Sequence, residues 1–187
     1  MHHIPNIISI FRIFLVLPIA IHLHQESWRV ALVLIFIAGI SDALDGFLAR
    51  KFNWQSRLGS FLDPIADKLL LIVIFVSLAH KDLIPLWLAF LVVARDAVIV
   101  AGASFYQWKT RALEISPLIS SKINTAVQVI FVLGLLVHLA VFPLSDSLIF
   151  GLKLAVALTT IVSGVLYVIC WSRHCKNHPS QVANKSI

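Results

Sequence analysis

Charged residues are scarce in this chain. Only 13% of its 187 residues are charged, and nine of them are Asp or Glu. Soluble domains carry about 25% charged residues, so this composition excludes a freely soluble domain. The two cysteines, Cys170 and Cys175, form neither a disulfide framework nor the spacing of a zinc site. The chain also shows no internal repeat, no low-complexity segment and no pattern of a cleavable signal peptide.

Apolar residues are abundant instead, at 59% of the chain, with a mean hydropathy of +0.94. A membrane-spanning helix needs about 20 mostly apolar residues. Six stretches qualify: 7–23, 28–49, 60–79, 83–106, 119–142 and 147–171. We therefore expect an all-α integral membrane protein with six transmembrane helices. A single six-helix domain over residues 1–172 would be followed by a polar tail at 173–187.

The basic residues between these stretches indicate an orientation, because cytoplasmic loops are enriched in Lys and Arg. One side of the membrane would hold Arg50, Lys51, Arg57, Lys109, Arg111, Arg173, Lys176 and Lys185, and the other side mainly Arg29 and Lys81. This predicts that both termini are cytoplasmic. The short N-terminus lacks an Arg-rich presequence, which favours a bacterial inner membrane over a mitochondrial one.

Five of the nine acidic residues lie within apolar stretches, where an uncompensated carboxylate is costly: Asp42, Asp45, Asp63, Asp67 and Asp96. In "AGISDALDGFLAR" the first two are spaced i,i+3, and Asp63 and Asp67 are spaced i,i+4, so each pair shares a helix face. Two adjacent antiparallel helices would present all four carboxylates to one cleft in the cytoplasmic half of the membrane. Four like charges require cations, and hard oxygen ligands favour magnesium, manganese or calcium.

Two divalent ions held by carboxylates suit phosphoryl transfer. Gly46 and Ala49 continue the acidic face with almost no side chain and would let a bulky headgroup approach. Arg50 and Arg57 would neutralise phosphate oxygens. The structural alternative is that the four aspartates pair with Arg50, Arg57 and Lys68, but pairing does not require the small residues.

The stretch "DALDGFLARKFNWQSRLGSFLDPIAD" contains the pattern D-x2-D-G-x2-A-R-x8-G-x3-D-x3-D without gaps. It resembles the CDP-alcohol phosphatidyltransferases, and the likeness extends over about residues 4 to 172. The resemblance implies six transmembrane helices, a homodimer and attack by an alcohol on a CDP-linked lipid with release of CMP. It gives no indication of a nucleic-acid partner.

The resemblance also implies residue roles. Asp42, Asp45 and Asp63 would bind one Mg²⁺ or Mn²⁺ ion, and Asp42, Asp63 and Asp67 the other. Asp67 would in addition be the general base that accepts the proton of the acceptor hydroxyl. The CDP-lipid site would be formed by Asp45, Gly46, Ala49, Arg50, Arg57 and Gly59.

The acceptor is indicated by "SSKINTAVQVIFVL" and by the "RD" of "VVARDAVIV". These segments are similar to the cardiolipin-synthase branch of the family, which joins CDP-diacylglycerol to phosphatidylglycerol. Phosphatidylglycerophosphate synthases are the alternative, and they typically have a second lysine where this chain has Asn124. A diester acceptor of charge −1 needs less basic compensation than a monoester near −2, so Lys122 beside a neutral Asn124 favours phosphatidylglycerol.

Six residues near the cytoplasmic half are the candidates for binding the acceptor: Asn6, Arg12, Arg95, Arg111, Lys122 and Asn124. Each has a structural alternative: a helix cap for Asn6, snorkelling for Arg12, a membrane anchor for Arg111, and cap and snorkel for Lys122 and Asn124. For Arg95 the alternative is a local pair with Asp96, or that Arg95 and Asp96 each bond a different helix.

Two other function classes compete with the phosphatidyltransferase. Intramembrane prenyltransferases also use two aspartate motifs, but their motifs are widely separated, whereas here one short loop joins the acidic pairs. Cation transporters often contain internal repeats, and none is visible in this sequence.

Overall fold

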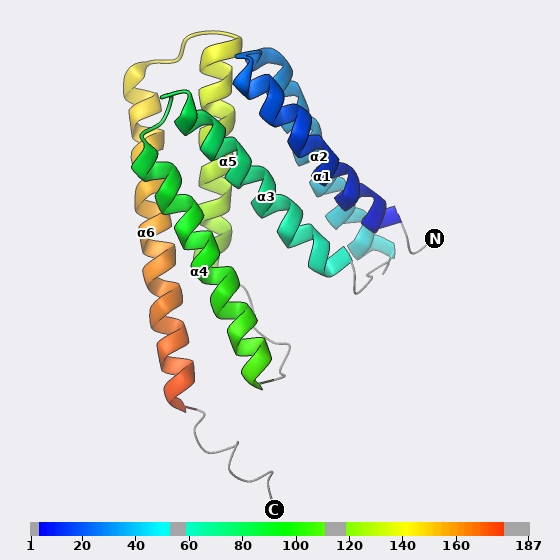
Figure 1. Ribbon diagram of the computed structural model, residues 1–187, viewed down its shortest axis with the longest axis vertical. Helices are drawn as coiled ribbons and strands as arrows, with labels where there is room; N and C mark the ends of the chain where they lie inside the picture. The colour runs from blue at the N-terminus through cyan, green and yellow to red at the C-terminus, as the bar shows by residue number, and fades with distance from the viewer. Residues whose placement is uncertain (1–3, 53–58, 111–118, 178–187) are drawn as a thin grey trace, which may run out of the picture.

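Six α-helices make up the part of the chain described by the computed structural model, which comprises residues 4–52, 59–110 and 119–177 (Figure 1). They are α1 (Ile4–His24), α2 (Trp28–Phe52), α3 (Gly59–His80), α4 (Leu86–Thr110), α5 (Ile119–Ala140) and α6 (Asp146–Asn177). Side chains are described for residues 10–42, 66–101 and 119–169. These ranges contain no strand, which confirms the all-α prediction.

The helix boundaries lie close to the predicted spans because polar and helix-breaking residues interrupt the apolar runs. Pro85 directly precedes α4, and Pro143 lies between α5 and α6, where a missing N–H removes no helical hydrogen bond. The largest difference is at α6, which continues to Asn177 instead of ending at residue 171. Residues 178–187 of the predicted tail lie outside the described part of the chain.

The helices contact one another in a closed ring. α1 packs against α2 and α3, α3 against α4, α4 against α6, α6 against α5, and α5 against α2. Successive helices run in opposite directions, and the α1–α2, α3–α4 and α5–α6 connections all lie at the upper end of the bundle in Figure 1. An N-terminal half (α1, α2 and α3) therefore meets a C-terminal half (α4, α5 and α6) at two contacts, α3 with α4 and α2 with α5.

Two of the connections at this upper end close with residues in the left-handed region. Glu26 has φ 59° and Asp82 has φ 56°. The side chains at these turns also bond across them, since Lys81 Nζ lies 2.9 Å from Glu26 Oε1. This pair fixes the α1–α2 turn beside the α3–α4 turn.

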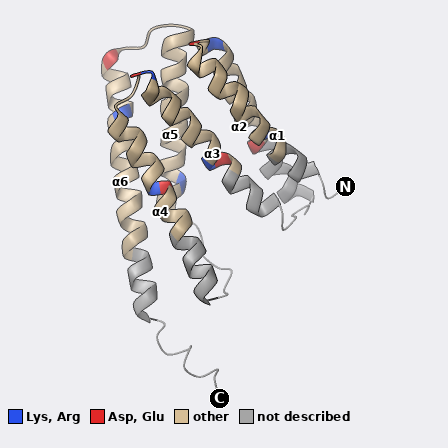
Figure 2. Ribbon diagram, viewed as in Figure 1, with Lys and Arg blue, Asp and Glu red and all other residues tan. Residues whose placement is uncertain are grey.

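The interior of the bundle is apolar, and Phe75 of α3 and Phe131 of α5 meet there with ring centroids 6.1 Å apart. The outside is apolar as well, with exposed large side chains that include Phe14, Leu86 and Phe90. Charged residues in the described part gather at the upper end and in a band lower in the bundle (Figure 2). That band contains the candidate site.

Within the described residues, two helical segments are long and apolar enough to cross a membrane, namely Ile119–Ala140 and Asp146–Ile169. The sequence predicts six. The parts of α1, α2, α3 and α4 whose side chains are described, residues 10–24, 28–42, 66–80 and 86–101, are each shorter than the roughly 20 residues that a span needs, so the comparison rests on α5 and α6. The coarser prediction of a helical chain with membrane-compatible helices is what the structure supports.

Candidate active site

Arg12 joins two of the predicted metal-binding carboxylates inside the bundle. Its side chain extends from α1 and is fully buried, with 0% exposed. Arg12 Nη2 lies 2.8 Å from Oδ1 of Asp42 on α2, and Nη1 donates to Oδ1 of Asp67 on α3. One guanidinium therefore brings together one carboxylate from each of the two predicted acidic pairs.

These three side chains line a pocket of about 130 Å³. The remaining walls come from α2, α3 and α5 and are mostly apolar: Ile35, Ala38, Gly39, Leu70, Leu71, Ile74, Thr125, Val129 and Val132. The Asp42 and Asp67 side chains keep 49% and 42% of their surface exposed, although Arg12 between them is buried. A ligand in the pocket can therefore reach both carboxylates.

Gly39 contributes space to this pocket, and it was not among the residues predicted from the sequence. It lies one turn before Asp42 on α2, and no atom outside its local helix backbone is found within 4 Å of the place that a Cβ would occupy. On α2 the sequence pattern assigns clearance to Gly46 and Ala49, further along the helix, and not to Gly39. The i,i+3 spacing of Gly39 and Asp42 could have identified Gly39 from the sequence, because it places the two residues on the same helix face.

The donors at the pocket fit a hard divalent cation. Asp42 and Asp67 offer carboxylate oxygens, which Mg²⁺ and Mn²⁺ prefer, and the lining includes neither His nor Cys. The other two predicted ligands, Asp45 and Asp63, belong to α2 and α3, but their side chains lie outside the described residues. Among the side chains that are described, no group of three or more His, Cys, Asp and Glu could hold a metal.

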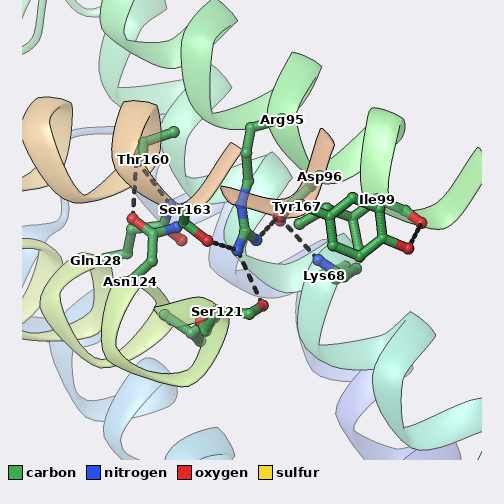
Figure 3. A network of polar contacts seen from close by, with 11 residues as sticks. Lys68, Arg95, Asp96, Ile99, Ser121, Asn124, Gln128, Thr160, Ser163 and Tyr167 are labelled. Carbon is green, nitrogen blue, oxygen red and sulfur yellow. Dashed lines mark hydrogen bonds and ion pairs between the residues drawn. The ribbon is translucent and has the colours of Figure 1, made fainter. Parts of the chain in front are cut away.

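A second polar cluster lies between α3, α4, α5 and α6 (Figure 3). Arg95 of α4 is buried at its centre, and its Nη1 donates to Oδ1 of Asp96 over 2.6 Å. Its Nη2 donates to Ser121 Oγ over 2.9 Å and also to Ser163 Oγ. Lys68 of α3 places Nζ 2.8 Å from Oδ1 of Asp96. Protein groups from four helices thus compensate the two buried charges.

The contacts in this cluster show how Arg95 and Asp96 are bonded. The predicted alternatives were a local pair or bonds to different helices, and both are present at once. Lys68 was a possible structural partner of the four aspartates in the metal motif, but its ion pair is with Asp96. Ser121 and Ser163 could not be identified from the sequence, because the spacing of these serines carries no distinctive motif.

Asn124 is fully buried on the side of α5 that faces α6. Its Oδ1 accepts a hydrogen bond from Thr160 Oγ1 over 3.0 Å, and the same hydroxyl accepts from Gln128 Nε2 at 3.5 Å (Figure 3). Asn124 does not line the pocket that contains Asp42 and Asp67. The structure therefore does not bring Asn124 to the acidic pair.

Lys122 lies on a different face of α5 and is exposed. It precedes the pocket residue Thr125 by three positions, and Val129 continues the same face. Two residues correspond to about 200° around a helix, so Lys122 and Asn124 point in nearly opposite directions. Of the two residues, Lys122 is the one on the pocket side of α5.

The remaining predicted site residues have less structural definition. Within the helices, but with side chains that are not described, lie Asn6 in α1, Asp45, Gly46, Ala49 and Arg50 in α2, and Gly59 and Asp63 in α3. Arg57 and Arg111 lie outside the described residues. Their predicted roles stay predictions.

Comparison with known proteins gives several relatives with the same name, among them one from rat and one from human. A cardiolipin synthase (CMP-forming) of Rattus norvegicus is 36% identical over 181 residues, which covers 88% of this chain and 60% of the rat protein. The Homo sapiens protein of that name is 37% identical over 161 residues, covering 78% of this chain and 53% of that protein. The chain thus spans little more than half the length of these curated relatives.

A bacterial relative matches over nearly its whole length. The CDP-diacylglycerol–glycerol-3-phosphate 3-phosphatidyltransferase of Bacillus subtilis is 33% identical over 183 residues, covering 89% of this chain and 94% of that protein. The family described as CDP-alcohol phosphatidyltransferase matches residues 2–170, which include both acidic pairs and the two polar clusters. The chain belongs to the CDP-alcohol phosphatidyltransferase family.

Proposed function

We propose that this protein transfers the phosphatidyl group of CDP-diacylglycerol to a hydroxyl of phosphatidylglycerol, producing cardiolipin and CMP. The observation that carries the proposal is the pocket in which Asp42 and Asp67, from the two halves of the family motif, lie on either side of Arg12. The names of the rat and human relatives favour cardiolipin and CMP as the products.

In the proposed reaction the acceptor hydroxyl oxygen forms a bond to the lipid-side phosphorus, and the bond from that phosphorus to CMP breaks. Asp67 receives the hydroxyl proton as general base. Asp42, Asp45, Asp63 and Asp67 would hold two Mg²⁺ or Mn²⁺ ions, which would stabilise the charge on the attacking and leaving oxygens. Gly46, Ala49 and Gly59 would admit the cytidine diphosphate, with Arg50 and Arg57 on its phosphates.

The acceptor phosphate would be bound first of all by Lys122, which is exposed on the pocket side of α5. Arg95 and Asn124 would act indirectly, by fixing the position of the helices that form the acceptor site, because both are buried in contacts between helices. Asn6 and Arg111 stay candidates for binding the acceptor phosphate directly. Arg12 is the candidate that fits this role least, because both of its Nη atoms contact the carboxylates of Asp42 and Asp67.

We also propose that all six helices cross the membrane and that the protein is a homodimer. The apolar exterior supports the membrane placement. The end of the bundle nearer the acidic pocket would face the cytoplasm of a bacterial cell, because the connections predicted on that side are rich in Lys and Arg.

A second candidate is transfer to glycerol 3-phosphate, which would give phosphatidylglycerophosphate. The specific observation in its favour is the Bacillus subtilis relative, which is 33% identical and is matched over 94% of its own chain. Purified protein would be supplied with CDP-diacylglycerol and either phosphatidylglycerol or glycerol 3-phosphate, and the lipid product identified by mass spectrometry. Cardiolipin supports the first proposal, and phosphatidylglycerophosphate alone replaces it with the second. Failure to release CMP with either acceptor contradicts both.

A further inference from the structure

Arg12 is the only Lys or Arg in α1, and it is completely buried. A charge in such a place is costly unless it is paired. We infer that Arg12 is a permanent cation of the proposed metal site. It holds Asp42 and Asp67 together, and it reduces the negative charge that these two carboxylates present to a divalent metal ion. This inference rests on the proposed metal-binding role of the two aspartates.

The contacts of Arg12 support a role inside the carboxylate group. The planar guanidinium presents several N–H donors in a fixed arrangement, and here two of its nitrogens contact carboxylates on two different helices. α1 itself packs against these same helices, α2 and α3. The side chain therefore ties α1 to both helices that carry the family motif.

The two sequence-based explanations of Arg12 fit these contacts less well. A snorkelling arginine would place its guanidinium in the lipid headgroup region, but this one is 0% exposed. An acceptor-binding arginine would need donors directed toward the acceptor phosphate. Both Nη atoms of Arg12 contact Oδ1 atoms of the acidic pair instead.

The effect of removing Arg12 on metal affinity follows from the charges of the three side chains. Asp42 and Asp67 together carry −2, and Arg12 reduces the sum over these three side chains to −1. Removing the arginine would leave the carboxylates repelling each other but attracting a metal ion more strongly. Even at the dielectric constant of bulk water, a unit charge about 4 Å away changes the affinity for a divalent ion by more than tenfold, and the change is larger at the lower effective dielectric constant of a buried site.

The test compares the full-length wild-type protein with Arg12→Gln, Arg12→Lys and, as a matched control, Arg29→Gln. Arg29 is on α2 and bonds the Ala140 carbonyl at the opposite end of the bundle, with 2.9 Å between Nε and the oxygen. Each protein would be purified in detergent with Mn²⁺ and then treated with chelator. Tm would be measured with and without added Mn²⁺, and Mn²⁺ affinity by electron paramagnetic resonance.

Arg12→Gln should have a lower Tm than wild type in chelator, a larger rise in Tm on adding Mn²⁺, and an Mn²⁺ Kd that is tighter by more than about tenfold. Arg12→Lys should deviate in the same directions but less, because an ammonium group lacks the fork that serves two carboxylates. If Arg12→Gln cannot be recovered, Arg12→Lys alone still tests the inference. Arg29→Gln should keep the wild-type Kd and the wild-type Mn²⁺-induced rise.

An Arg12 variant whose Mn²⁺ affinity and Tm response equal those of wild type, or are weaker, overturns the inference. So does a wild-type protein whose Tm does not respond to Mn²⁺, even if it synthesises cardiolipin. The opposite result, in which the Mn²⁺ pattern is as expected but CMP is never released from CDP-diacylglycerol, contradicts the proposed function and leaves the inference standing.

Discussion

At the scale of single residues, Asp67 has a contact that bears on its proposed role as base. Its Oδ1 accepts from Arg12, so the carboxylate is oriented by a fixed positive charge beside the pocket. Asparagine at this position would retain an oxygen for Arg12, but it could neither accept a proton as a base nor contribute a charged metal ligand. Loss of function can therefore be separated from loss of structure at this residue.

Asp67→Asn should reduce CMP release from CDP-diacylglycerol by roughly 10³-fold, within the range for loss of a general base, while the protein stays folded. The measurement is CMP formation together with Tm. Asp82→Asn is the matched control, since Asp82 lies in the turn at the far end of α3 and asparagine tolerates its positive φ. Turnover retained by Asp67→Asn would contradict the role of Asp67 as base.

Lys122→Ala should raise the KM for the acceptor by about tenfold or more and change the KM for CDP-diacylglycerol much less. The reason is the loss of a charge-assisted contact to the acceptor phosphate. Steady-state kinetics with each substrate varied in turn would measure both constants. Lys153→Ala, at the opposite end of the bundle on α6, should change neither KM. An unchanged acceptor KM in Lys122→Ala would remove this residue from the site.

At the scale of the helix, α5 shows how one element serves two purposes. Its Thr125 lines the pocket, and Lys122 lies one turn earlier on the same side by helical spacing. Asn124 and Gln128 bond Thr160 of α6 instead. Further along, Gly134 allows α6 to approach closely, because an added Cβ would be 3.2 Å from Leu152 Cδ1. The position of the pocket face thus depends on packing at another face of the same helix.

Gly134→Leu should destabilise the protein by about 1–3 kcal/mol, the usual range for overpacking a close contact. The measurement is Tm, and activity should fall as α5 shifts. Gly151→Leu is the matched control, since Gly151 on α6 is exposed and has no atom outside its local helix backbone within 4 Å of the position that a Cβ would take. Equal Tm losses in the two variants would contradict the prediction that close packing at Gly134 is needed for stability.

At the scale of the whole molecule, three connections lie at one end of the bundle: α1–α2, α3–α4 and α5–α6. If every helix crosses the membrane, these connections must share one side of it. Single cysteines at Glu26, Asp82 and Ser145, introduced after replacing Cys170 and Cys175, should all react with an impermeant thiol reagent from that side. The control is labelling after permeabilisation, and a position that labels only from the opposite side would contradict the six-span topology.

The sequence predicted the helices well because each apolar run ends at charged or proline-containing joints, as at Pro85. It also predicted that acidic residues from two helices would converge, since Asp42 and Asp67 have fixed places in the motif. It did not predict their bonds to Arg12, because the packing of α1 against α3 determines that contact and helical periodicity does not encode it. It also grouped Lys122 with Asn124, although a separation of two residues puts them on different faces.

Asp67 and Lys68 follow each other on α3, yet Asp67 bonds toward α1 and Lys68 toward Asp96 on α4. This has a practical consequence for exchanging parts between family members. A hybrid that takes α4, α5 and α6 from a relative with another acceptor cannot simply be spliced in the α3–α4 turn. Residue 68 would have to come from the donor, because it pairs with α4, while residue 67 would have to stay with the recipient, because it pairs with α1. The exchange therefore has to divide α3 according to which neighbouring helix each residue contacts.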